Sequence, residues 1–387
     1  MRSEATSESW TPSALKRVLI VETQLKHYRK SFLIDLAARL RRDGVELQVA
    51  YSPPHGAARA LQDTVELDGD LGVSVPVRFL FGGSVVVQSI WPQVRAADLV
   101  IVEQGNKLAF NYVLLTLSKL GLKRVAYWGH GFNHQQSNPG ISDWLKRKLL
   151  TRVDWWFAYT SEVTRYLVHH GVPADTISTV HNTVDVADLT ADVAPNARAA
   201  LRDALGISAS SPVGLYCGAL VPEKQLGFLV DAAAEVRRLL PNFELIIVGD
   251  GAERSMLDAI AGVRPFIHVV GPALGVARAP YFAIADICMI PARVGLAIVD
   301  AFASGIPLAT TNHPGHGPEL EYLSPDLDGL KTEFDVDSYA AEVARLLGDR
   351  PRLDAMRRAA SAAATPLTKQ RMVEEFATGI IRCLGRP

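Results

Sequence analysis

The chain has 387 residues, of which 48% are hydrophobic and 21% charged, and its formal net charge is −1. This length favours two domains over one, and the balanced charge gives no support to a nucleic-acid-binding protein. The three cysteines (Cys217, Cys288 and Cys383) show no CxxC spacing, which argues against a zinc knuckle or a disulfide framework and fits a reducing compartment.

The N-terminal segment, residues 1–15, is polar and lacks the apolar region of a secretory signal, so we expect it to be disordered. No stretch reaches the roughly 18 uninterrupted apolar residues of a membrane-spanning helix. The best candidate, LAFNYVLLTLSKLGL, is interrupted by Asn111, Ser118 and Lys119. The sequence therefore predicts a cytoplasmic protein, in contact with the inner face of the cytoplasmic membrane at most.

Short β-branched runs alternate with helical patterns along the chain. RVLIV (17–21) precedes the helical pattern SFLIDLAARLRRDG, and VELQVAY, DLVIVEQ, RVAYWGHG and DWWFAYT follow. The alternation breaks in a polar, Ala/Ser/Pro-rich stretch (189–212) and resumes with VGLYCGA, FELIIVGDG, FIHVVG, DICMIPA and IPLATTN. This pattern is typical of βα units around parallel sheets, and we predict an α/β protein with two such domains.

Ligands of parallel α/β sheets bind beyond the carboxyl ends of the strands, so the residues after each strand are the first candidates for a site. The first strand of the second domain ends at Gly218, and Lys224 follows where a helix begins. Free N–H groups and the helix dipole favour anions there, so this lysine would suit a diphosphate. The alternative is a solvated lysine beside Glu223. Neither domain has GxGxxG after its first strand, which disfavours a nicotinamide-linked dehydrogenase.

The stretch ARVGLAIVDAFASGIP (292–307) predicts a loop, a short apolar helix and a Gly-Pro stop. Asp300 lies inside that helix, and burying it without a partner would be costly, so its charge faces either water or a ligand. Gly295 allows a ligand to approach the backbone closely. Glu319 follows Pro318 in a predicted first helical turn, where capping explains it as well as function does.

Taken together, these stretches resemble the nucleotide-binding domain of glycosyltransferase family 4, which contains retaining enzymes of the GT-B fold. The resemblance is carried by GALVPEK, LIIVGDGAER, VVGP, YFAIADICMIPA, VGLAIVDAFASGIPLATT and HGPELEYL. In the first domain, ETQLKHYRKSFLIDLAARL, YWGHGFN and VHNTVD are similar to that family's opening, central and closing motifs, and QRMVEEFATGI is similar to its last helix. The likeness covers residues 16–385, and only the ensemble of motifs is specific.

The resemblance implies two Rossmann-like domains that face each other across a cleft. Residues 16–190 would form the N-terminal acceptor-side domain, 191–211 the linker, and 212–365 the nucleotide-sugar-binding domain. The helix within 366–387 would cross back to the N-terminal domain.

The resemblance also assigns roles to individual residues. Asp300 takes the place of a glutamate that holds the ribose hydroxyls, Lys224 would hold the diphosphate, and His130 would contact the donor sugar near the reacting carbon. For His130, capping or stacking is the structural alternative. The other expected donor-binding residues are Gly218, Val270, Arg293, Val294, Gly295 and Leu296.

Two positions depart from the family's common pattern. The first of its paired glutamates falls at Ala292, and the arginine that accompanies the lysine falls at Ala219. We expect the chain to belong to a branch that lacks that glutamate, and Arg293 to be a candidate for the missing cation.

Further candidates come from the strand ends of the first domain and from the segment after residue 312. The acceptor-side candidates are His27, Tyr28, Arg29, Glu103 and Asn133, and the other cleft candidates are His316 and Glu319. No cluster has metal-ligand spacing, and the resemblance implies metal-independent chemistry with no cofactor, in which Lys224 and helix dipoles stabilise the departing diphosphate.

A basic amphipathic pattern, ISDWLKRKLLTR (141–152), suggests peripheral membrane contact, although an ordinary surface helix explains it equally well. We expect a retaining hexosyltransferase that uses a nucleotide-diphosphate sugar and a glycan or polyprenyl-diphosphate-linked acceptor, in bacterial surface polysaccharide assembly. The alternatives are a non-catalytic GT-B protein that binds a nucleotide or glycan, and a GT-B nucleotide-sugar epimerase.

Overall fold

The computed structural model describes residues 15–54, 64–105, 107–131, 148–190 and 193–386. Its first sheet has seven strands, all parallel, in the order β3-β2-β1-β6-β7-β8-β9. The strands are β1 (Lys16–Val21), β2 (Val45–Tyr51), β3 (Gly72–Ser74), β6 (Leu99–Glu103), β7 (Arg124–Gly129), β8 (Trp155–Ala158) and β9 (Ile177–Thr179). Their apolar runs are buried on both faces, as a parallel sheet between helices requires.

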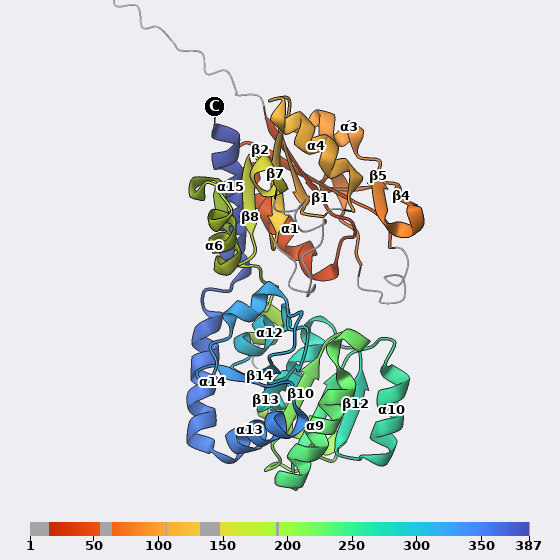
Figure 1. Cartoon of the computed structure of the whole chain (residues 1–387). Helices are drawn as coiled ribbons and strands as arrows, with labels where there is room; N and C mark the ends of the chain where they lie inside the picture. Colours follow the sequence, from red (N-terminus) through yellow and green to blue (C-terminus); the bar gives the residue numbers. More distant parts are fainter. Residues whose placement is uncertain (1–14, 55–63, 106, 132–147, 191–192, 387) are drawn as a thin grey trace, which may run out of the picture.

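Helices cover both faces of this sheet (Figure 1). They are α1 (His27–Arg41), α3 (Trp91–Ala96), α4 (Ala109–Lys119) and α6 (Ser161–His169). An antiparallel hairpin, β4 (Val77–Leu80) and β5 (Val85–Gln88), lies at the side of the sheet away from α6 (Figure 1). The βα alternation of the sequence does not predict this hairpin, because its two short apolar runs follow each other without a helix between them.

The second sheet has six strands, also all parallel, in the order β12-β11-β10-β13-β14-β15. The strands are β10 (Val213–Cys217), β11 (Glu244–Val248), β12 (Ile267–Gly271), β13 (Ile287–Met289), β14 (Leu308–Thr311) and β15 (Gly329–Thr332). The helices around it are α7 (Ala187–Thr190), α8 (Pro195–Ala204), α9 (Leu226–Leu239), α10 (Arg254–Val263), α11 (Ala279–Ile284), α12 (Ala297–Ala303), α13 (Val336–Gly348) and α14 (Arg350–Ala364). The prediction of two Rossmann-like parallel sheets is confirmed.

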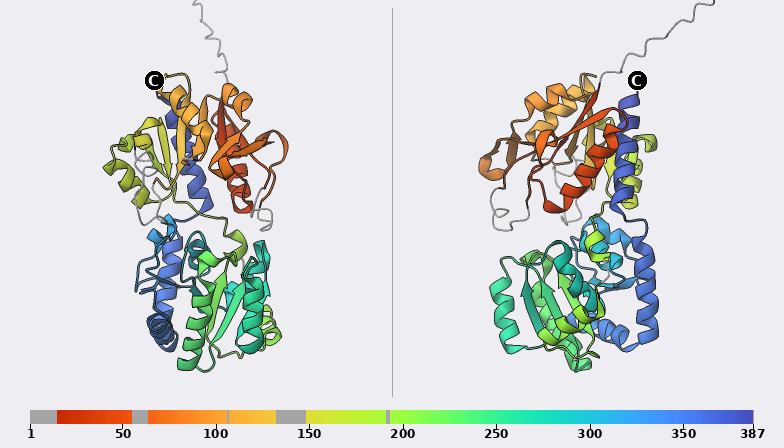
Figure 2. Two further views of the ribbon diagram at one scale, coloured as in Figure 1. Left: turned by 45° about the vertical axis from the view of Figure 1, so that its right-hand side comes forward. Right: turned by 180° about the vertical axis from the view of Figure 1, so that it is seen from behind.

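The last helix, α15 (Lys369–Gly385), leaves the second sheet and packs against the first (Figures 1 and 2). Its Phe376 ring stacks on Phe157 of β8 with 4.3 Å between ring centroids, and it also contacts Phe32 and Trp128. The predicted crossover helix is therefore confirmed, and its apolar face completes the core of the first sheet.

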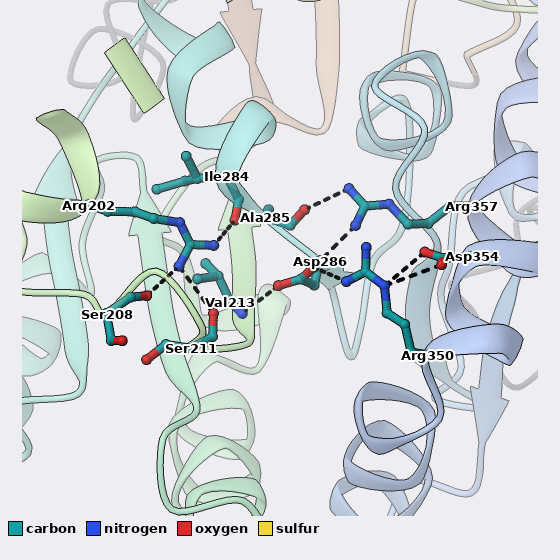
Figure 3. Close-up of polar contacts among 10 residues, drawn as sticks. All are labelled: Arg202, Ser208, Ser211, Val213, Ile284, Ala285, Asp286, Arg350, Asp354 and Arg357. Atoms are coloured by element: carbon teal, nitrogen blue, oxygen red, sulfur yellow. Dashed lines mark hydrogen bonds and ion pairs between the residues drawn. The ribbon is translucent and has the colours of Figure 1, made fainter. Parts of the chain in front are cut away.

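Asp286, just before β13, ties three elements together at the amino ends of the second sheet (Figure 3). Its carboxylate accepts hydrogen bonds from the Val213 N–H at 3.0 Å and from the Arg357 guanidinium of α14 at 3.1 Å. On the other side, Arg202 of α8 donates to the carbonyls of Ser208, Ser211 and Ile284. These contacts lie opposite the carboxyl ends of the strands, so they serve the fold and not the site.

In the part of the chain that the structure describes, no helix is both long enough and apolar enough to cross a membrane.

Candidate active site

Lys224 lies beyond the carboxyl end of β10, in a short 3₁₀ turn (Pro222–Lys224) that Gln225 ends in the left-handed conformation (φ 57°). Its ammonium donates a hydrogen bond to the carbonyl oxygen of Arg293 at 2.6 Å. Burial, and to a lesser extent Arg293, lowers the pKa of Lys224 to about 8, so the side chain remains a cation at neutral pH. A half-buried ammonium ion at the start of α9 can hold an anionic group.

The loop between β13 and α12 is held by His316, which is buried. His316 Nδ1 accepts a hydrogen bond from the Val294 N–H at 3.1 Å, and its Nε2 lies 3.1 Å from the Thr311 carbonyl oxygen. These contacts require a neutral ring protonated on Nε2, and burial lowers the pKa of His316 to about 4. His316 therefore positions the loop.

Arg293 in the same loop has φ 52°, a conformation that costs energy in a non-glycine residue. Val294 is fully buried, while Leu296 and Val270 are half-buried. A Cβ added to Gly295 would meet no atom within 4 Å, so the backbone there is open on that side. Gly218 lies against Gly249, where any side chain would collide with the Gly218 carbonyl group.

Asp300 of α12 is buried and forms an ion pair with Arg278, with 2.7 Å between Asp300 Oδ2 and Arg278 Nη1. Burial raises the pKa of Asp300, and the charges of Arg278 and of His27 oppose that rise. Asp300 Oδ1 and Arg278 Nε have no hydrogen-bond partner among the described residues. The acidic residue in the apolar helix thus faces a cation and keeps one buried acceptor atom unused.

Arg278 is not among the residues predicted from the sequence. It follows β12 in the segment GPALGVARAPYF, which is itself a strand end, so the rule that identified Lys224 would have found it.

In the first sheet, two carboxyl groups follow neighbouring strands. Glu22 follows β1 and is buried, and Glu103 ends β6. The Arg29 guanidinium lies 3.1 Å from Glu22 Oε1, donates to the Tyr159 hydroxyl at 2.9 Å, and stands 3.8 Å above the centre of the Trp128 ring. Arg29 is thus part of a buried network.

One guanidinium group cannot neutralise two adjacent carboxylates. Burial raises the pKa of Glu22 to about 8, and the neighbouring Glu103 adds to the rise while Arg29 opposes it. At neutral pH, Glu22 therefore keeps its proton, while Glu103 accepts a hydrogen bond from the Thr23 hydroxyl at 3.2 Å. Glu103 is one of the residues predicted from the sequence, whereas Glu22 is not.

A pocket of about 370 Å³ opens beside these groups, and its lining consists of Glu22, Thr23, Gln24, Lys26, Tyr28, Arg29 and Glu103. His130 follows β7, is exposed, and stacks on Tyr159 with ring centroids 5.7 Å apart and planes 14° apart. Because Tyr159 also binds Arg29, His130 is connected to the wall of the pocket. His27 is the first residue of α1, and its ring packs edge-on against Tyr28.

The strand ends of the two sheets are joined through Glu319, which is buried. Its carboxylate accepts a hydrogen bond from Asn182 Nδ2 at 2.6 Å, and the Tyr322 hydroxyl donates to the Asn182 carbonyl at 3.0 Å. Burial raises the pKa of Glu319, while Asn182, and more weakly Arg29 and Lys224, oppose the rise. Residues from both sheets therefore meet around the candidate site.

Asn133 and most of the segment 141–152 lie outside the described residues. Among the residues that are described, no group of three or more His, Cys, Asp or Glu side chains is arranged to hold a metal ion.

Two family models match this chain. The one described as Glycosyltransferase Family 4 matches residues 31–188, and the one described as Glycosyl transferases group 1 matches residues 211–349.

Among curated proteins, the chain is similar to the GDP-mannose-dependent alpha-(1-6)-phosphatidylinositol monomannoside mannosyltransferase of Mycobacterium tuberculosis. The two are 25% identical over 361 residues, which is 88% of this chain and 92% of that protein. A D-inositol 3-phosphate glycosyltransferase of Nocardia farcinica is 28% identical over 225 residues, or 54% of this chain and 49% of that protein.

Among solved structures, HepE of Anabaena in complex with UDP superposes with a TM-score of 0.68 at 18% identity, over 95% of this chain and 99% of that one. Sucrose-phosphate synthase of Thermosynechococcus elongatus gives a TM-score of 0.68 at 15% identity, over 94% and 98% of the two chains. At these identities the likeness establishes the fold, which is GT-B.

Proposed function

Because the chain belongs to the family 4-like glycosyltransferases, we propose that it transfers a hexose from a nucleotide-diphosphate sugar, with retention of configuration, to a glycan or lipid-linked glycan acceptor. The observation that carries the proposal is the presence of two clusters of polar side chains, one at the strand ends of each sheet. Lys224, Arg278 and Asp300 belong to the second sheet, and Glu22, Glu103 and His130 belong to the first.

On the donor side, Lys224 and the N-terminus of α9 take the diphosphate, and their positive charge stabilises it as it departs without a metal ion. The ribose of the nucleotide fits the unused buried acceptor, Asp300 Oδ1, because a hydroxyl group supplies the missing donor. Arg278 supplies the positive charge of the family's arginine, whose position is occupied by Ala219 in this chain. Arg293 remains the second candidate for that role, since its backbone carbonyl accepts the hydrogen bond of Lys224 and its side chain belongs to the same loop.

On the acceptor side, the pocket beside Glu22 and Glu103 takes the hydroxyl-bearing end of the acceptor. A protonated Glu22 donates a hydrogen bond and a carboxyl oxygen of Glu103 accepts one, which suits a hydroxyl group that does both. His130 extends from this wall toward the donor sugar. The transfer follows front-face attack, in which the leaving phosphate accepts the proton of the acceptor hydroxyl.

The acceptor class is supported by the relatives. The Mycobacterium mannosyltransferase is named for a phosphatidylinositol monomannoside, and an alpha-monoglucosyldiacylglycerol synthase of Acholeplasma laidlawii is 30% identical to this chain over 115 residues, 28% of this chain and 29% of that protein. Both names describe lipid acceptors or products. We therefore place the reaction in the assembly of lipid-linked glycans of the bacterial surface, at the inner face of the cytoplasmic membrane.

Thermal unfolding in the presence of UDP, GDP, ADP or CMP tests the donor site. A ligand at 100 times its Kd adds about 2.7 kcal/mol to the free energy of unfolding, which raises the melting temperature by a few degrees. We expect a response to one nucleoside diphosphate, followed by sugar transfer or slow donor hydrolysis with the matching nucleotide sugar. Isomerisation of the sugar would identify an epimerase, and no response to any nucleotide would contradict the transferase.

A further inference from the structure

The hairpin β4–β5 has apolar side chains on both of its faces. In the register Phe79↔Val86 and Leu80↔Val85, Val86 is buried against the body of the domain. The opposite face, which carries Leu80 and Val85, points outward, and Leu80 is 44% exposed. A half-buried antiparallel ribbon normally has polar side chains on its outer face, so this composition indicates a surface that becomes covered.

The tip and the base of the hairpin extend this surface. Phe81 at the tip is 83% exposed. At the base, Trp91 begins α3, is 45% exposed, and packs against Phe110 of α4 with 6.0 Å between ring centroids. Val113, one turn further along α4, is also exposed. We call the group Leu80, Phe81, Trp91 and Val113 the hairpin surface.

The segments that form the hairpin surface carry charges of one sign only. Residues 75–97 and 105–123 contain five Lys and Arg residues and no Asp or Glu. Arg78 lies on the outward face of the hairpin and Arg95 lies one turn after Trp91 on α3. Lys107 lies beside β5, since its carbonyl accepts a hydrogen bond from the Val86 N–H. None of these three side chains forms an ion pair with a described residue.

The hairpin surface is attached to the acceptor pocket. The side chain of Gln88 at the end of β5 donates a hydrogen bond to the Glu22 carbonyl at 3.0 Å. Asn111 in the first turn of α4 donates to the Glu103 carbonyl at 2.8 Å. The elements that present the exposed apolar side chains are therefore fixed to the two strand ends that carry the pocket's carboxyl groups.

We propose that the hairpin surface docks the protein on an anionic lipid bilayer and thereby presents a lipid-linked acceptor to the pocket beside Glu22 and Glu103. Aromatic and aliphatic side chains with flanking cations, and no carboxylates, match the interface of such a membrane. This proposal rests on the proposed function for its acceptor, and it uses residues different from the basic segment 141–152.

Flotation of the full-length protein with vesicles tests the docking, using phosphatidylcholine alone and phosphatidylcholine with phosphatidylglycerol. We expect binding to the anionic vesicles that weakens with salt. The double variant Leu80→Ser/Phe81→Ser should bind about tenfold more weakly. Arg78→Ala should bind about fivefold more weakly. The matched control is Val263→Ser, since Val263 is 79% exposed at the end of α10 in the other domain.

The thermal response to the nucleoside diphosphate, measured on the same variants, separates docking from the donor site. Variants that keep this response and their melting temperature, but lose vesicle binding and transfer to a vesicle-borne acceptor, support the proposal. Wild-type binding by the hairpin variants overturns it, and so does a change from dimer to monomer on Phe81→Ser in light scattering, which would identify a subunit interface. If the wild type shows no thermal response to any nucleoside diphosphate, that result contradicts the proposed function and not the docking.

Discussion

Lys224 is a half-buried ammonium group whose hydrogen-bond partner among the described residues is a carbonyl oxygen, not a carboxylate. Burial already works against its charge, and an anionic ligand would restore the balance. We expect Lys224→Ala to weaken binding of the nucleoside diphosphate by about 10- to 100-fold, because a hydrogen bond to a charged group contributes about 1.5–3 kcal/mol. Isothermal titration of the variant measures the change.

Lys16→Ala is the matched control. Lys16 is exposed and pairs with Asp98 at the amino end of β1, whereas the candidate site lies at the carboxyl ends of the strands. An unchanged affinity of the Lys224 variant would remove this residue from the donor site. Lys224→Arg should recover part of the affinity if charge alone matters, and none if the hydrogen bond to the Arg293 carbonyl requires a lysine.

Glu22 makes stability depend on pH. Its pKa is raised from 4.5 to about 8 in the folded protein, so the folded state binds more protons than the unfolded state between these values. The free energy of unfolding must then fall as the pH rises through this window. Glu22→Gln removes the contribution, and we expect the stability of the variant relative to wild type to increase by about 2–3 kcal/mol from about pH 6 to pH 8.

Urea unfolding at several pH values measures this difference. Glu46→Gln is the control, because Glu46 is exposed on β2 and pairs with Arg17. If the free energies of unfolding of Glu22→Gln and of the wild type change in parallel with pH over the whole range, Glu22 is ionised at neutral pH. The hydrogen-bonding pattern that we assign to the acceptor pocket is then wrong.

At the level of elements, the tie between α14 and the second sheet depends on Asp286. Its carboxylate satisfies a backbone N–H of β10 and neutralises Arg357 (Figure 3). Asp286→Ala leaves both donors without their acceptor, and we expect it to lower the free energy of unfolding by about 2–4 kcal/mol. Asp354→Ala, which removes only a more exposed partner of Arg350, should cost under about 1 kcal/mol.

Chemical denaturation compares the two variants, and nucleotide binding at low temperature should be the same in both. A change in nucleotide affinity for Asp286→Ala would show that the amino ends of the strands act on the site after all.

The strands and the crossover helix could be predicted because the pattern of apolar residues within each segment is enough to indicate them. Val18 to Val21 in β1 and Ile246 to Val248 in β11 are continuous apolar runs, and α15 has one apolar stripe. Lys224 and Asp300 could also be predicted, because Lys224 follows a strand end and Asp300 is a charge inside an apolar helix. The contact between Asp300 and Arg278 spans 22 residues and that between Glu22 and Glu103 spans more, and only the sheet order brings such groups together.

At the scale of the whole molecule, α15 belongs to the fold of the first sheet although it follows the second in the chain. Gly379, in the middle of α15, makes the close approach possible, since a Cβ there would lie 2.7 Å from Phe157 Cε1 and 3.0 Å from Trp155 Nε1. Gly379→Ala must therefore push the helix away from β8 and β9, and we expect a cost of about 1–3 kcal/mol, partly offset by the better helix propensity of alanine.

Gly262→Ala in α10 isolates the propensity effect, because a Cβ there meets no atom within 4 Å. We expect this control to keep or raise the melting temperature, whereas Gly379→Ala lowers it by a few degrees. Since α15 is the segment by which the end of the chain returns to the first sheet, the Gly379 variant should also lose more transfer activity than donor affinity. Equal melting temperatures for the two variants would mean that α15 does not pack on the first sheet as closely as Gly379 allows.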